Sequence, residues 1–313
     1  MSTALHASLA QHLNGVVHLP ETGVIRVAGA EAAQFLHGQL TQDILLMGQH
    51  EARLAAFCSA KGRMLASFMV FKRGTEEVLL TCSRDILPQT VKRLSMFVLR
   101  AKAKVSDASD TLAVYGVAGA ALQALMQQLN STALKTDAGD ATLLLLAPAG
   151  SAPRGLWLAP ADAPPPAGPA LDAALWQWGS VHSGIAPITA PTVEAYVPQM
   201  LNYESVGGVH FQKGCYPGQE VVARSQFRGT LKRRAYIVHG AAAMAVGQEV
   251  FHAEDASQPC GTVALAAPSP LGGWDAIASL QTAAATGGTL HLGAADGPAL
   301  ELLPLPYPLR DDI

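Results

Sequence analysis

The octapeptide at residues 213–220 reads Lys213-Gly214-Cys215-Tyr216-Pro217-Gly218-Gln219-Glu220. Its glycines and proline predict loop structure around Cys215, so we expect the thiol to face solvent. Pro217 suits the first position of a helix, because its missing N–H would have no partner there. The positive end of that helix and the Lys213 ammonium would both favour thiolate over thiol. These features predict a functional thiol at Cys215; the alternative is a buried, inert cysteine.

The octapeptide resembles the signature of the YgfZ family, the folate-binding proteins of iron–sulfur cluster maintenance. That family is related to the T-protein (GcvT), the aminomethyltransferase of the glycine cleavage system. Further blocks extend the resemblance over nearly the whole chain; they lie at residues 34–43, 60–63, 197–202, 223–233 and 303–307.

The resemblance implies an α+β, aminomethyltransferase-like fold, with ferredoxin-like α/β lobes and a C-terminal antiparallel β-barrel around a central opening. We expect residues 1–228 to form a folate-binding body of two interwoven lobes, and residues 229–313 to form the barrel domain. Independently, the short β-like runs after residue 229 are separated by Gly, Pro, Ser and Asp, which is typical of a small barrel or sandwich.

Hydrophobic periodicity and turn residues predict the individual elements. Asp85 is the expected cap of a helix with apolar residues at 87, 91, 94 and 98. Prolines between residues 147 and 169 predict an irregular surface loop there. The other expected elements are a strand at 24–27, a helix at 30–40, a hairpin of 54–58 with 64–71, a strand and helix at 112–117 and 120–129, and barrel strands at 235–238, 262–265 and 277–280.

The resemblance also implies a ligand, tetrahydrofolate or another reduced folate. Trp176 lies on a predicted helix, and its indole can stack on a pterin or fill a core. It matches a tryptophan associated with folate binding in the family, whereas a second family tryptophan is replaced here by Thr22. The remaining predicted folate contacts cluster in and after the octapeptide: Lys213, Tyr216, Gln219, Glu220, Arg224 and Arg228.

A basic, acid-free segment follows the octapeptide, with Arg or Lys at positions 224, 228, 232, 233 and 234. It could form an anion site for a folate polyglutamate tail or a phosphate backbone, because arginine offers forked donors to both groups. It could equally be a solvated strand edge, where cations discourage unwanted pairing.

The sequence argues against aminomethyl transfer. Ala66 and Ser67 stand where the T-protein has its acidic pair, and neither can act as a carboxylate base. His182 likewise stands in a segment that lacks the T-protein's acidic folate contact. For covalent catalysis at Cys215, His210 is the nearest candidate base in sequence, and His182 and His239 are further candidates.

Composition limits the other possibilities. The chain of 313 residues has a formal charge of −3, unlike a protein built to coat nucleic acid. Its four cysteines form no Cys-x-x-Cys pair, so we expect no resident metal or self-contained iron–sulfur site. No run reaches the roughly 18 apolar residues of a membrane span. The first twenty residues contain no Lys or Arg, unlike a signal or transit peptide, so we expect a cytoplasmic protein.

Three functional hypotheses follow. The first is a folate-binding accessory protein that supports iron–sulfur cluster assembly or repair, with a transient cluster shared with client or assembly proteins and indirect effects on tRNA modification. The second is a folate-dependent one-carbon transferase resembling an aminomethyltransferase. The third is an RNA-binding module that uses the basic segment.

Overall fold

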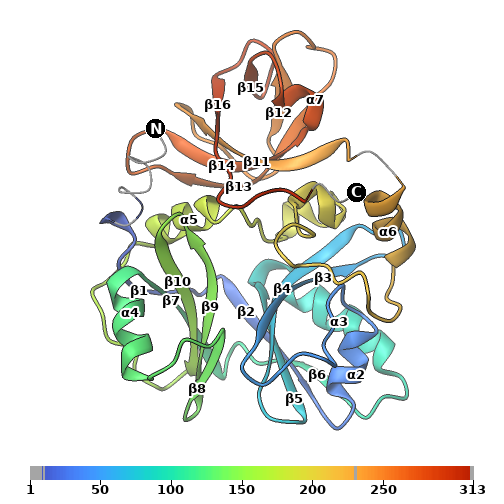
Figure 1. Cartoon of the computed structure of the whole chain (residues 1–313), viewed down its shortest axis with the longest axis vertical. Coiled ribbons are helices and arrows are strands. Elements are labelled where there is room, and N and C mark those ends of the chain that lie inside the picture. The colour runs from blue at the N-terminus through green and yellow to red at the C-terminus, as the bar shows by residue number, and fades with distance from the viewer. Residues whose placement is uncertain (1–8, 10, 229–230, 311–313) are drawn as a thin grey trace.

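The computed structural model describes residues 9, 11–228 and 231–310 of the chain. Two five-stranded sheets lie side by side at one end of the molecule, and a closed antiparallel barrel lies at the other (Figure 1). One helix, α5 (Ala173–His182), lies between the second sheet and the barrel. Among the described residues, no helix is both long and apolar enough to cross a membrane.

The first sheet has the strand order β3-β4-β5-β2-β6, and every neighbouring pair is antiparallel. The predicted hairpin at residues 54–71 is confirmed as β3 and β4. Asp85 is not a helix cap: its carboxylate accepts the N–H of Ala190, and a short 3-10 turn precedes α3. The elements are β2 (Thr22–Ala28), α2 (Ala32–His37), β3 (Ala52–Cys58), β4 (Met64–Lys72), β5 (Glu77–Ser83), η1 (Arg84–Ile86), α3 (Leu87–Val98) and β6 (Lys104–Asp107).

The second sheet has the strand order β1-β7-β10-β9-β8. Helix α4 covers one face, where Leu122 packs with Val117 and Leu143. The other face carries Leu156 and Leu158, which belong to the main core. The elements are β1 (Gly15–His18), β7 (Leu112–Ala118), α4 (Gly119–Gln128), β8 (Lys135–Ala138), β9 (Ala141–Ala149) and β10 (Ala152–Pro160).

The predicted loop at residues 147–169 is wrong in its first half, because β10 occupies residues 152–160 as a central strand. The prolines are tolerated at positions where the ladder needs no N–H. Pro148 and Pro153 flank the β9–β10 turn, where the register shifts, and Pro160 is the last residue of its strand.

Six strands close the barrel in the order β11-β14-β13-β12-β15-β16. The three predicted barrel runs are confirmed within β11, β13 and β14. The predicted domain boundary falls beside residues 229 and 230, which lie outside the described residues, and it stays a prediction. The elements are β11 (Arg233–Gly240), β12 (Glu249–His252), β13 (Gly261–Pro268), β14 (Trp274–Gln281), α7 (Thr282–Ala285), β15 (Leu290–Leu292) and β16 (Ala299–Leu303).

A buried carboxylate joins α5 to the barrel. Asp275 of β14 accepts a 2.6 Å hydrogen bond from the Trp178 indole, and it is hydrogen-bonded to His182 at 2.8 Å and to His239 at 2.7 Å. Burial alone would raise the pKa of Asp275, but these three contacts lower it below its ordinary value. The barrel is therefore anchored to the helix by an ionised, fully hydrogen-bonded group.

Two glycine turns meet backbone to backbone where α6 (Gln219–Phe227) begins. A Cβ on Gly218 would lie 2.3 Å from the carbonyl oxygen of Ser59 and 2.7 Å from the Cα of Gly62. Gly218 also has a φ of +79°, a conformation that favours glycine. The β3–β4 hairpin and the octapeptide can therefore meet only if neither turn carries a side chain at this contact.

We predict that Gly218→Ala lowers the free energy of unfolding by about 2 kcal/mol more than Gly74→Ala. Gly74 is a matched control, because its φ is also +79° but nothing lies within 4 Å of its added Cβ. Urea unfolding of both variants measures the difference, and equal losses would contradict the role of the turn contact.

Candidate functional site

Cys215 is exposed, as predicted, whereas the other three cysteines are buried. Burial raises the pKa of both Cys58 and Cys82 to about 12, so these thiols are kept neutral. The helix predicted to start at Pro217 begins two residues later, at Gln219 within the octapeptide, with Gly218 as its N-cap. Cys215 therefore lies in the loop that leads into α6.

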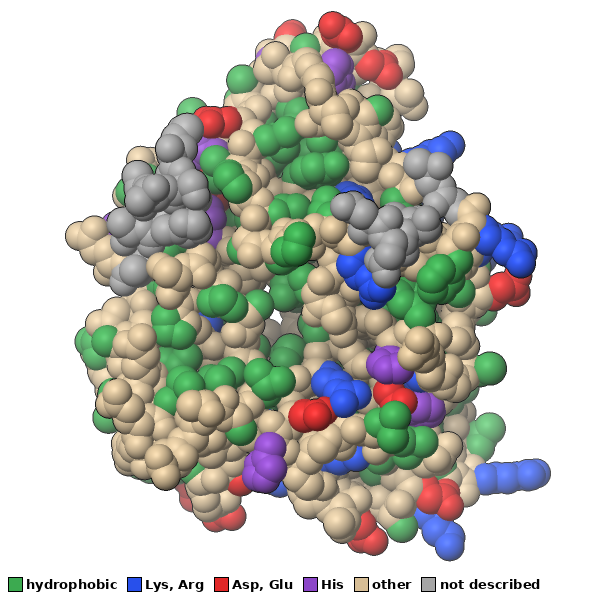
Figure 2. All heavy atoms as spheres, viewed as in Figure 1, with side chains coloured by type: hydrophobic (Ala, Val, Ile, Leu, Met, Phe, Trp, Pro, Cys, Tyr) green, Lys and Arg blue, Asp and Glu red, His purple; other side chains and the backbone are tan. Residues whose placement is uncertain are grey.

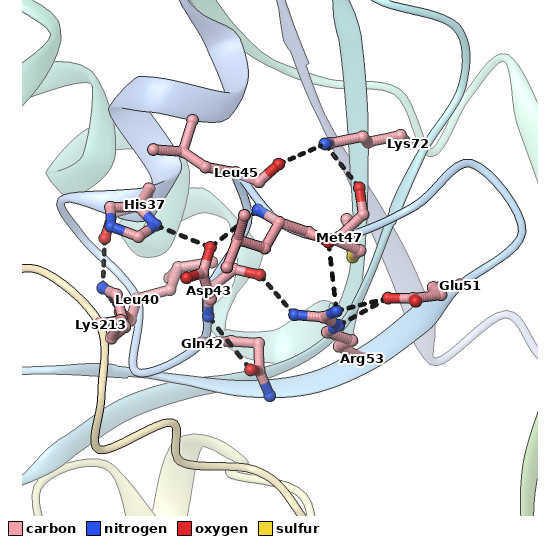
Figure 3. Close-up of polar contacts among 11 residues, drawn as sticks. His37, Leu40, Gln42, Asp43, Leu45, Met47, Glu51, Arg53, Lys72 and Lys213 are labelled. Atoms are coloured by element: carbon pink, nitrogen blue, oxygen red, sulfur yellow. Dashed lines mark hydrogen bonds and ion pairs between the residues drawn. The ribbon is translucent and has the colours of Figure 1, made fainter.

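Lys213 is held against the end of α2. Its ammonium donates to the backbone carbonyls of His37 and Leu40, the second at 2.8 Å (Figure 3). It also lies 4.8 Å from the ring centroid of Tyr216. Burial lowers the pKa of Lys213 to about 8, although the charges of Asp43 and Cys215 oppose this shift. Lys213 thus fixes the start of the octapeptide and places a partly buried positive charge near the thiol.

His37 and Asp43 lie behind the same loop. His37 Nδ1 is 3.2 Å from Asp43 Oδ1, which also accepts the N–H of Leu46 at 2.9 Å (Figure 3). Burial would raise the pKa of Asp43, but the Leu46 bond and the His37 charge lower it. Burial and Lys213 lower the pKa of His37, against the effect of Asp43.

The imidazole of His37 packs against the octapeptide itself. A Cβ on Gly214 would lie 3.2 Å from His37 Nε2, so this nitrogen faces the residue before Cys215. As a candidate base, sequence reasoning named His210, whose backbone N–H donates to the backbone carbonyl of Thr41 at 2.9 Å, and did not name His37. The sequence block at residues 34–43 contains both His37 and Asp43 and could have indicated that they belong to the site.

Cations on the first sheet hold the segment after Asp43. Arg53 donates to the carbonyl of Asp43 at 2.8 Å, and Lys72 donates to the carbonyls of Leu45 and Met47 at 3.3 and 2.7 Å (Figure 3). The irregular backbone beside the octapeptide is therefore tied to strands β3 and β4.

The other predicted contacts in this region divide between core and surface. Tyr216 is buried, and this burial raises the pKa of its hydroxyl. Glu220 and Arg224 are exposed and pair with each other at 2.7 Å across one turn of α6. Arg228 is exposed, and Gln219 is half-buried. Their assignment to a ligand stays a prediction.

Trp176 lies away from this cluster, on α5, where its ring packs against β7 of the second sheet. Its side chain is only 8% exposed, with the Arg154 guanidinium 4.3 Å from the ring centroid. A Cβ on Gly116 would lie 2.8 Å from the indole, so β7 can accept the ring only because it carries glycine there. Burial lowers the pKa of Arg154 to about 9. The molecule is hollowed at its centre, between the sheets and the barrel (Figure 2).

Ala66 and Ser67, the positions matched in sequence to the acidic pair of the T-protein, are both buried on β4. The hydroxyl of Ser67 accepts the N–H of Ile188 at 2.8 Å. This position therefore supports the backbone of a neighbouring segment and presents no carboxylate. Within residues 9, 11–228 and 231–310, no group of three or more His, Cys, Asp or Glu side chains is arranged to hold a metal ion.

The basic segment is largely structural at its C-terminal end. Arg234 forms a buried ion pair with Glu204 at 2.5 Å, and Arg233 donates to the carbonyl of Cys260 at 3.0 Å. At Arg233 and Arg234, β11 pairs with β14 alone, because β16 pairs only with residues 237–240. The interpretation as a solvated strand edge is wrong at Arg234, because this side chain is buried. The exposed cations that remain are Arg224, Arg228 and Lys232.

The sequence is similar to curated bacterial proteins named tRNA-modifying protein YgfZ. The protein from Edwardsiella ictaluri is 35% identical over 234 residues, which cover 70% of this chain and 69% of that protein. The chain belongs to the YgfZ family. The protein from Yersinia enterocolitica is 28% identical over 314 residues, covering 95% and 93% of the two chains. The model of the GCVT N-terminal domain matches residues 7–141.

The fold is that of the T-protein. The crystal structure of glycine cleavage system aminomethyltransferase T from Bartonella henselae superposes with a TM-score of 0.69 and 14% identity, covering 97% of this chain and 89% of that one. The aminomethyltransferase-like fold expected from the YgfZ resemblance is thus confirmed.

We predict that only Cys215 reacts quickly with a thiol reagent such as Ellman's reagent in the native protein, because the other thiols are buried. The Cys215→Ala variant should lose this fast phase, and denaturant should expose the remaining thiols in both proteins. A fast phase that survives in Cys215→Ala would contradict the exposure of this one thiol.

Stability should also depend on the charge of Lys213. Because its pKa falls from 10.5 to about 8 on folding, the unfolded chain binds more protons between these values, and the cost of burying the Lys213 ammonium is relieved as pH rises. We expect the free energy of unfolding of the wild type, relative to Lys213→Met, to rise between about pH 7.5 and 10. Urea unfolding across this range measures it; a constant difference would argue against a buried ammonium.

Proposed function

We propose that this YgfZ-family protein binds a reduced folate and supports the assembly or repair of iron–sulfur clusters in other proteins. The observation that carries the proposal is the exposed thiol of Cys215, in a loop fixed by Lys213 and Gly218. The name tRNA-modifying protein, carried by its relatives, fits an indirect effect, since cluster-dependent enzymes thiolate tRNA.

The site supports binding better than one-carbon transfer. The T-protein fold is retained, but Ala66 and Ser67 replace the carboxylates expected of a transferase, and Ser67 already bonds to Ile188. Fold alone does not carry an activity. Direct RNA binding has less support, because Arg233 and Arg234 are engaged within the protein.

The residues around Trp176 fit the polar edge of a pterin. Arg154 donates to Ser180 at 2.5 Å, but its buried Nε has no hydrogen-bond acceptor among the described residues. A carbonyl oxygen on a ligand ring would supply that acceptor, and the indole would supply an aromatic contact. We therefore assign Trp176 and Arg154 to the folate, which when bound would supply a one-carbon carrier.

Cys215 would act on a cluster only together with a partner. A stable iron–sulfur cluster takes four protein ligands, and the octapeptide offers one thiolate. Cys215 would supply this single ligand while a client or assembly protein supplies the rest. The exposure of the loop allows such sharing, and Lys213 would balance part of the negative charge of a thiolate-bound cluster.

We predict that Cys215→Ala fails to complement a strain defective in iron–sulfur enzyme maturation, while its free energy of unfolding stays within about 0.5 kcal/mol of wild type. Gln212→Ala is the matched control, because Gln212 is also exposed in the same loop, and it should complement fully. Full complementation by Cys215→Ala would remove the role proposed for the thiol.

We also expect tetrahydrofolate to quench tryptophan fluorescence saturably, and Trp176→Phe to weaken its binding by about tenfold, or about 1.4 kcal/mol. Trp274→Phe, on a barrel strand, should bind as tightly as wild type. Unchanged affinity in Trp176→Phe would exclude this indole from the folate site.

A further inference from the structure

A cleft of about 480 Å³ lies between the first and second sheets, lined by residues other than those assigned to folate or to the thiol. One wall is basic: Arg26 comes from β2, and Arg73 from the β4–β5 turn. The opposite wall comes from the second sheet, with Leu112 at the start of β7 and Asp140 in the β8–β9 turn.

The two arginines share a single carboxylate. Arg26 Nε lies 2.8 Å from one oxygen of Glu77, and Arg73 Nε donates to the other oxygen. Glu77 therefore balances one of the two positive charges. The strand pairing fixes this arrangement, since Arg26 and Glu77 are diagonal neighbours on one face of β2 and β5, and Arg73 N–H donates to the Glu77 carbonyl.

The outer ends of both guanidinium groups remain available. Each arginine faces Glu77 through Nε, and in the part of the chain that the structure describes, no hydrogen bond engages the terminal Nη groups of either. The two side chains are 32% and 30% exposed, so ligand and solvent can reach them. Two forked donor groups and one unbalanced positive charge thus form this wall of the cleft, while the carboxylate of Asp140 stands on the opposite wall.

We propose that Arg26 and Arg73 bind the phosphate group of a small phosphorylated molecule. One guanidinium fork saturates the two oxygens of a carboxylate, whereas a phosphate has three terminal oxygens and a second negative charge with which to engage both forks. Asp140 is exposed on the opposite wall and would accept a hydrogen bond from a hydroxyl or amino group of the same ligand. A phosphate monoester that carries hydroxyl groups fits both walls.

The ligand would also connect the two sheets. Arg26 and Arg73 belong to the first sheet and Asp140 to the second, so one bound molecule contacts both. Because it binds only the folded arrangement, it raises the midpoint of thermal unfolding with concentration. This site lies outside the proposed folate and thiol chemistry and can be tested without either.

The test is isothermal titration of the full chain with sn-glycerol 3-phosphate, inorganic phosphate and citrate. We expect glycerol 3-phosphate to bind at least about tenfold more tightly than citrate, and Arg26→Gln and Arg73→Gln each to weaken it by about tenfold or more. Each variant leaves Glu77 paired with the other arginine, so folding should persist. Arg84→Gln is the control, because Arg84 is an exposed arginine that pairs with Asp110 at 3.2 Å and does not line the cleft; it should bind as wild type does.

Three outcomes would overturn the proposal. The first is that the wild type shows no binding when glycerol 3-phosphate is raised to about 10 mM, because a dissociation constant above this value would mean that no specific site exists. Another is citrate binding as tightly as the phosphate ester, which would remove the preference for phosphate. The third is unchanged affinity in both arginine variants when their unfolding curves show that they are folded.

Discussion

Gly62 and Gly218 meet backbone to backbone, and this contact fixes the position of the octapeptide against the first sheet. The hairpin turn of the first sheet lies directly against the turn that starts α6, with backbone atoms on both sides. Lys213 anchors the other end of the octapeptide on two carbonyls at and just after the end of α2, those of His37 and Leu40. Cys215 lies between two fixed points, so its exposure results from restraint of the loop at both ends.

Much of the fold could be predicted because local pattern and tertiary structure agree. The hairpin around Gly62, the apolar spacing of α3 and the short strands of the barrel all follow from residues close in sequence. The predictions of secondary structure were wrong where contacts between residues far apart in the sequence determine the local conformation. β10 forms despite Pro153 because the β9–β10 register shifts there, and Asp85 bonds to Ala190, more than a hundred residues away.

In the candidate site, too, features set by neighbouring residues could be predicted, and features set by distant contacts could not. The exposure of Cys215 follows from its flanking glycines and proline, but the burial of Lys213 depends on α2, far away in the chain. His37 was missed because only folding brings it against Gly214. Arg233 and Arg234 look like surface cations in sequence, yet their partners, Cys260 and Glu204, are distant.

The carboxylate of Asp275 has a consequence for how members of this fold can diverge. It is satisfied by donors on two different elements, Trp178 and His182 of α5 and His239 of β11. An asparagine there would offer one acceptor oxygen in place of two, and loss of one partner would leave a buried polar atom unmatched. Helix and barrel should therefore be exchanged between relatives as a unit, and a chimera joined between them would need all of these side chains from the same parent.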